Sequence, residues 1–243
     1  MAEITIIGSG DAFGSGGRMS TCFYVKADGG NFLIDCGASA IPGIKKNGIN
    51  PDDIDVVLLS HFHGDHYGGL PFLLLEMAVY GRLKPLVIVS PPGCRERLEK
   101  LLELLYPGTE VWSKLKINFY EYEAHVTLNI GLLKVTAFPV IHTAEVLPHG
   151  LRIQVDGKII AYSGDTSWTD ELIPLSADAD LFICECNFFD LEVKNHLNYQ
   201  TLKEKLVLLS YKKIFLTHFD NEMMRNFDRV ELPCASDGMR IAF

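Results

Sequence analysis

The sequence lacks any apolar run long enough to cross a lipid bilayer. Its most apolar stretch, residues 68–79, is interrupted by Pro71 and Glu76, and it is shorter than the roughly 20 residues that a membrane-spanning helix requires. The first seven residues form a strand-like run with no basic segment before it, so they do not resemble an export signal. We therefore expect a cytoplasmic protein without a membrane partner.

Cysteine and positive charge are also scarce. The six cysteines are spread along 243 residues, and several lie in apolar runs. In a chain without an export signal, this pattern predicts reduced, buried thiols instead of a disulfide framework. The 22 basic residues are outnumbered by 31 acidic ones, which gives a formal net charge of −9. This charge disfavours a protein that grips nucleic acid by electrostatics alone.

The remaining composition is that of a soluble folded protein. Hydrophobic residues make up 48% of the chain and charged residues 22%, which excludes the disordered and collagen-like classes. No Pro/Ser-rich linker or low-complexity run divides the sequence. We therefore expect a single domain over residues 1–243.

Two kinds of apolar run predict the secondary structure. Runs rich in leucine and β-branched residues are typical of strands, and a leucine face at helical spacing is typical of helices. The expected strands are residues 3–7, 22–26, 31–35, 54–60, 85–90, 115–122, 132–139, 151–155, 158–163, 180–185 and 213–217, and the expected helices are 69–80, 92–105 and 199–209. Stacked sheets with helices on their outer faces would bury all of these runs, which indicates an α/β fold.

The strongest functional signal is the segment His61-Phe62-His63-Gly64-Asp65-His66. It directly follows an expected buried strand, and α/β folds place their ligands at the carboxyl ends of strands. The exit from the strand can aim His61 and His63 at one ion and turn Asp65 and His66 toward a neighbouring one. A solvated polar loop is a poor alternative, because this segment gathers three of the eight histidines in the chain.

Three further residues stand where ligands of the same site would be expected. His142, Asp165 and His218 each follow the end of an expected strand, as the histidine cluster does. This repeated placement argues for one shared site. Imidazole and carboxylate groups suit zinc, manganese or iron, and the number of histidines favours zinc.

The HxHxDH pattern at residues 61–66, with His142, Asp165 and His218, resembles the metallo-β-lactamase superfamily. The segments at residues 7–13 and 161–166 are similar to its ribonuclease Z-like branch, and the resemblance covers nearly the whole chain. It implies a four-layer αββα sandwich with two divalent metal ions between the sheets, with Zn²⁺ favoured over Mn²⁺ or Fe.

The resemblance also implies how the ligands are shared. The first ion would be held by His61, His63 and His142, and the second by Asp65, His66 and His218. Asp165 would bridge the two ions. A hydroxide held between the ions would be the nucleophile at neutral pH, and the ions would neutralise charge on the phosphate oxygens.

Two residues bear on the class of substrate. His196 precedes an expected helix, and Glu185 ends an expected strand. In the ribonuclease Z-like branch, residues at matching positions protonate the leaving oxygen and orient that proton donor, so His196 and Glu185 are expected to be catalytic together with Asp65. The alternative is that His196 is a capping or surface residue. The pair favours phosphoesters over lactams or lactones, because an alkoxide leaving group needs a proton.

One departure from the tRNA-processing enzymes narrows the substrate. Those enzymes carry a long basic, glycine-rich arm that grips RNA, whereas only 30 residues separate Asp165 from His196. Large RNA is therefore disfavoured. Smaller relatives act on small phosphodiesters, including cyclic nucleotides and cyclic sugar phosphates. We predict a dinuclear phosphodiesterase for a small or cyclic phosphodiester, and the relatives suggest a homodimer.

Several alternatives stay open. The same metals could serve a lactonase or thioesterase, a tRNA 3′-processing endonuclease, or a metal-binding sensor without enzymatic activity. No role is assigned to His125. His149 could border the pocket, Arg18 could meet an anion, and the glycine-rich loop at residues 8–17 could pass close to the substrate, because glycines allow close backbone approach.

Overall fold

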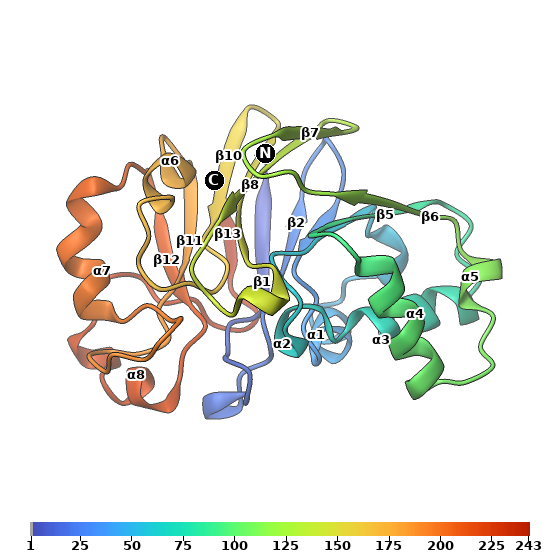
Figure 1. The fold of residues 1–243 in the computed structure, drawn as a ribbon, viewed down its shortest axis with the longest axis horizontal. Coiled ribbons are helices and arrows are strands. Elements are labelled where there is room, and N and C mark those ends of the chain that lie inside the picture. The colour runs from blue at the N-terminus through green and yellow to red at the C-terminus, as the bar shows by residue number, and fades with distance from the viewer. Residues whose placement is uncertain (1) are drawn as a thin grey trace.

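The computed structural model describes residues 2–243, so Met1, which begins the predicted first strand-like run, lies outside the described residues. Two mixed β-sheets form the centre of the molecule, and helices cover the two outer sides (Figure 1). The αββα sandwich predicted from the sequence is confirmed.

The two sheets divide the chain between them. One has seven strands in the order β13-β1-β2-β3-β4-β5-β6, and the other has six in the order β12-β11-β10-β9-β8-β7. The first sheet contains β1 (Glu3–Gly8), β2 (Cys22–Lys26), β3 (Phe32–Ile34), β4 (Val56–Leu58), β5 (Leu86–Ser90), β6 (Ile117–Glu121) and β13 (Arg240–Ala242). The second contains β7 (Thr127–Ile130), β8 (Leu133–Pro139), β9 (His149–Val155), β10 (Lys158–Tyr162), β11 (Leu181–Glu185) and β12 (Ile214–Thr217).

The helices fall into two groups, one beside each sheet (Figure 1). Beside the seven-stranded sheet lie α1 (Ala40–Lys46), α2 (Gly64–Tyr67), α3 (Leu70–Val79), α4 (Cys94–Leu105) and α5 (Val111–Lys114). Beside the six-stranded sheet lie α6 (Leu172–Ser176), α7 (Tyr199–Lys205) and α8 (Asn221–Arg225). Within residues 2–243, no helix is both long and apolar enough to span a bilayer.

Successive side chains along each strand point to opposite faces of its sheet, and this alternation produces the layers of the fold. In β4, Val56 and Leu58 belong to the core between the sheets, whereas Val57 belongs to the core shared with the helices α1, α3 and α4. In β11, Ile183 faces the other sheet and Phe182 faces the helices of its own side. Because successive side chains point to opposite faces, a strand that is apolar throughout is covered on both faces.

The predicted strand at residues 54–60 is too long. β4 covers only Val56–Leu58, because the backbone then leaves the sheet to form the histidine segment. The Ser60 amide and hydroxyl donate to the Asp35 carboxylate, at 2.8 and 2.7 Å. The predicted helix at residues 199–209 ends as α7 at Lys205 and continues as a 3₁₀ turn.

Parallel strands bring the functional loops to one edge. Strands β3 to β6 are parallel in one sheet, and β10 to β12 are parallel in the other. Since the carboxyl ends of parallel strands meet at the same edge, the loops that follow β3, β4, β10, β11 and β12 converge there.

Candidate metal centre

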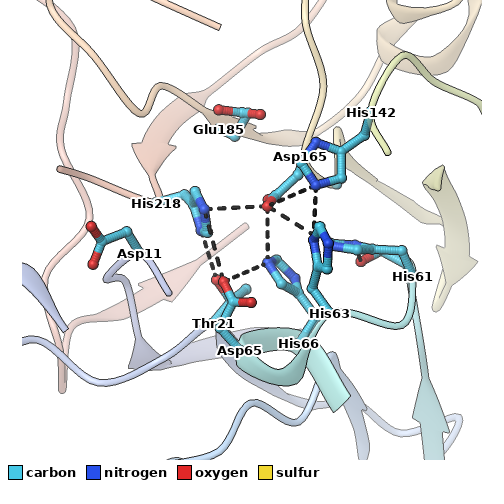
Figure 2. Close-up of polar contacts among 12 residues, drawn as sticks. Asp11, Thr21, His61, His63, Asp65, His66, His142, Asp165, Glu185 and His218 are labelled. Atoms are coloured by element: carbon cyan, nitrogen blue, oxygen red, sulfur yellow. Dashed lines mark hydrogen bonds and ion pairs between the residues drawn. The ribbon is translucent and has the colours of Figure 1, made fainter. Parts of the chain in front are cut away.

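The structure brings all seven expected metal ligands together from loops of both sheets (Figure 2). Their ligand atoms form two groups, and within each group the atoms lie within 4.8 Å of one another. One group consists of His61, His63, His142 and Asp165, and the other of Asp65, His66, Asp165 and His218. Asp165 is shared by the two groups.

The Asp165 carboxylate lies at the centre of the cluster. Its Oδ2 atom is 3.2 Å from Nε2 of both His66 and His218, 3.8 Å from Nε2 of His61 and 4.0 Å from Nε2 of His142. The preceding Gly164 has a φ of 61°, and a Cβ atom there would lie 2.5 Å from the His149 carbonyl oxygen. Glycine is therefore needed for the backbone to carry Asp165 into the site.

Hydrogen bonds on the outer ring nitrogens orient four of the histidines. Each Nδ1 has a polar partner, which leaves Nε2 to face the ligand cluster. The pairs are His61 with Ser60 Oγ at 3.0 Å, His66 with Asp35 Oδ2 at 2.8 Å, His142 with the Asn195 carbonyl at 2.8 Å, and His218 with Thr21 Oγ1 at 3.2 Å.

The unpartnered atoms of the cluster fit a divalent cation. In the described part of the chain, His61 Nε2, His66 Nε2 and Asp165 Oδ1 are buried without a hydrogen-bond partner. Buried polar atoms almost always have one, and a bound cation would supply it. The nitrogen and oxygen donors are those that zinc, manganese and iron accept. The residues present therefore fit divalent metal ions.

The charges around the cluster favour a cation at its centre. Burial lowers the pKa of His61 well below its ordinary value, which favours the neutral imidazole. Burial alone would raise the pKa of Asp165, but His218 and His66 hold it well below its usual range. Burial would also lower the pKa of His66, but Asp165 and Asp65 raise it well above normal. The carboxylates around His66 thus favour positive charge, which a divalent cation also provides.

Glu185 and His196 form a pair beside the second group of ligands. His196 Nδ1 lies 3.2 Å from Glu185 Oε1, and the His196 ring stacks on the His218 ring with 5.6 Å between centroids. Glu185 is fully buried and also accepts hydrogen bonds from the Thr166 and Leu197 amides. Burial alone would lower the pKa of His196, but the Glu185 carboxylate raises it to about 9. The Glu185 carboxylate therefore favours the protonated imidazole, which is the form that can donate a proton.

The candidates without an assigned role lie outside both groups. The exposed His125 ring lies 3.7 Å from Glu171. His149 begins β9, and its ring donates to the Leu147 carbonyl at 2.8 Å. Arg18, considered as an anion contact, donates instead to Ser9 Oγ at 2.6 Å and to the Ala235 carbonyl at 2.9 Å.

Sequence reasoning missed Asp35, Thr21 and Asn195, which orient three of the histidines. The Asp35 carboxylate is fully buried and accepts hydrogen bonds from Ser60 and from the Tyr162 hydroxyl in addition to its contact with His66. A signal for Asp35 was present, because it stands at the end of an expected strand, as the ligands do. Thr21 and Asn195 gave no such signal, since they lie far in sequence from the histidines that they orient.

Replacing Asp35 with asparagine should weaken metal affinity about 10- to 100-fold, the usual cost of losing a partner outside the ligand shell. Asparagine lacks the negative charge of Asp35. That charge orients the His66 ring and strengthens the interaction of His66 with a cation. Titration of the metal-free protein against a competing chelator measures the affinity. Asp228→Asn, at an exposed carboxylate, is the matched control. Equal affinities for the variant, the control and the unaltered protein would refute this role.

Fold and site together define a metal-dependent hydrolase of the metallo-β-lactamase superfamily, in its ribonuclease Z-like branch. YhfI from Bacillus subtilis, a metallo-β-lactamase fold protein, superimposes with a TM-score of 0.82 at 23% identity and full coverage of both chains. The short form of human tRNase Z (ELAC1) gives a TM-score of 0.80 at 24% identity, with 99% of this chain and 98% of that chain covered.

Sequence comparison agrees with the structural similarity. Ribonuclease Z of Lachnoclostridium phytofermentans is 24% identical over 93% of this chain and 90% of that protein. Within this class, the family model described as the anti-Pycsar protein Apyc1 matches residues 2–232. The chain belongs to this family.

Proposed function

We propose that this protein is a dinuclear phosphodiesterase that acts on a small or cyclic phosphodiester. The observation that carries the proposal is the buried Glu185 carboxylate, 3.2 Å from Nδ1 of His196, beside the two groups of metal ligands. A phosphodiester with an alkoxide leaving group needs a proton donor at the leaving oxygen. A lactone or thioester has less need of one, so this pair favours phosphodiester chemistry.

Two metal ions would share the seven clustered residues. His61, His63 and His142 would hold the first ion, Asp65, His66 and His218 the second, and Asp165 both. When bound, divalent ions supply positive charge that polarises a phosphoryl group, and they acidify coordinated water. Zinc is the preferred metal because five of the seven ligands are histidines.

The other functional groups belong to the chain itself. His196 protonates the leaving oxygen, and Glu185 holds the imidazole in the orientation and charge state that this step requires. Glu185 also accepts hydrogen bonds from the backbone amides of Thr166 and Leu197. It therefore links the loop that carries Asp165 to the loop that carries His196. We count Asp65 with these residues as catalytic because it lines the same cavity as His196.

The size of the site supports a small substrate. The cavity that contains His63, Asp65 and His196 has a volume of about 550 Å³. Residues 166–195 form α6, β11 and short connections, with none of the long arm expected of an enzyme that grips tRNA. The net charge of −9 also weighs against a large RNA on the outer surface. A homodimer in the cytoplasm remains part of the proposal.

A substrate panel tests the proposed function. Protein loaded with zinc or manganese should hydrolyse bis(p-nitrophenyl) phosphate and a cyclic nucleotide, and a chelator should abolish both reactions. The panel includes a lactone, a thioester and a precursor tRNA, and metal content is measured in every sample. Faster turnover of the lactone or thioester would reject the phosphodiesterase. Faster cleavage of the precursor tRNA would favour the endonuclease suggested by the name of the ribonuclease Z relatives.

A further inference from the structure

Phe13 places an aromatic ring at the candidate metal centre. It lies on the glycine-rich loop at residues 8–17, and 90% of its surface is exposed. Phe13 nevertheless lines the same cavity as His63, Asp65 and His196. An exposed phenylalanine on the wall of a reaction site is a contact surface for whatever enters it, because covering the ring removes apolar area from water.

Hydrogen bonds on both sides of Phe13 hold the backbone that carries the ring. The buried Asp11 carboxylate accepts hydrogen bonds from the Phe13 amide at 3.1 Å, the Ser15 amide at 2.9 Å and the Ser15 hydroxyl at 2.7 Å. The Asn221 side chain of α8 also donates to the Ser15 hydroxyl. Gly14 has a φ of 67°, a left-handed conformation that favours glycine. The backbone of the loop is thus ordered before a substrate arrives, which lowers the entropic cost of binding.

The other residues that line the cavity indicate which chemical group of a substrate would contact the Phe13 ring. Apart from Phe13, the candidate metal ligands and His196, the cavity is lined by Ala12, Ser20, Ala38 and Gly64. Among the described residues that line the cavity, none is lysine or arginine. A second phosphate would therefore find no lysine or arginine side chain in the cavity. A flat apolar group would find an aromatic ring and two methyl groups.

We propose that Phe13 is a specificity-determining residue whose ring stacks on a planar aromatic group of the substrate, such as a nucleobase. The phosphodiester would occupy the metal centre, and the aromatic group attached to it would lie against Phe13. Stacking on an aromatic side chain tolerates any base, because every base presents a π-face. The site would thus prefer aromatic phosphodiesters over aliphatic ones without selecting one base. This inference rests on the proposed phosphodiesterase function.

Two esters with the same leaving group test the role of Phe13. The p-nitrophenyl ester of thymidine 5′-phosphate carries a base, and methyl p-nitrophenyl phosphate does not. The unaltered protein should have the higher kcat/KM on the thymidine ester, mainly through a lower KM. In Phe13→Ala, the ratio of the two kcat/KM values should fall about tenfold, as expected for the loss of one stacked base. Phe13→Trp should retain the ratio.

The ratio of the two kcat/KM values distinguishes a loss of stacking from a loss of folding or of bound metal. A loss of folding or metal would slow both esters together and leave the ratio unchanged. Phe72→Ala, on α3 and outside the cavity lining, is the matched control and should also keep the ratio. An unchanged ratio in Phe13→Ala overturns the stacking role and leaves the phosphodiesterase standing. If the metal-loaded protein hydrolyses neither ester, the proposed function fails and the inference fails with it.

Discussion

Replacing His196 with alanine should slow hydrolysis of a cyclic nucleotide by about 10²- to 10⁴-fold, the usual contribution of a general acid. The leaving group of that substrate is an alkoxide, which departs poorly unless it is protonated. On bis(p-nitrophenyl) phosphate the loss should be much smaller, because p-nitrophenolate is a stable anion. Initial rates on both substrates, measured with metal content, give the comparison. Metal content should not change, since His196 belongs to neither ligand group.

Two variants support the interpretation of this result. His125→Ala removes an exposed histidine outside the site and should leave both rates unchanged. Glu185→Gln keeps the size of the side chain but removes the charge that raises the pKa of His196, so it should lose rate on the cyclic nucleotide selectively. Equal losses on both substrates in His196→Ala would reject proton donation. They would favour a role in substrate placement.

The layers of the fold could be predicted from the sequence because burial on both faces leaves a visible pattern. Continuous apolar runs mark β5, β11 and β12, and each of these strands contributes to the buried cores. The ends of elements were harder to predict, because they depend on contacts remote in sequence. The strand at residues 54–60 stops early, since the Ser60 amide donates to the Asp35 side chain instead of to a backbone carbonyl of a neighbouring strand. Helix α1 was missed because Pro42 and Gly43 are poor helix formers.

The clustering of the candidate ligands could also be predicted, but not the network that orients them. Histidine and aspartate are chemically distinctive as candidate ligands, and each candidate follows a strand, so position and residue type reinforce each other. Their outer partners are ordinary groups such as the Thr21 hydroxyl and the Asn195 carbonyl. Asn195 also has a φ of 72°, a left-handed conformation for a residue other than glycine. Such features become visible only when the loops are placed together.

Replacing Asp165 with alanine should remove metal as well as activity. Its Oδ2 atom lies within 4.0 Å of Nε2 of four histidines, and it is the carboxylate that the two ligand groups share. Loss of a shared ligand should affect both ions, so the metal bound per chain should fall below two. Activity should fall by more than the roughly 100-fold that loss of an outer partner can cost. Elemental analysis and initial rates on bis(p-nitrophenyl) phosphate measure both effects.

Comparison with two further variants distinguishes a bridging ligand from a merely structural carboxylate. Asp165→Asn keeps the shape of the side chain but removes its charge, so it should lose metal even if the variant melts at the same temperature as the unaltered protein. Asp170→Ala, at an exposed carboxylate five residues away, should retain metal and rate. Asp165→Ala that still binds two ions per chain would refute the bridging assignment. The shared oxygen would then have to come from elsewhere, and Asp65, the other carboxylate in these two groups, would be the next residue to test.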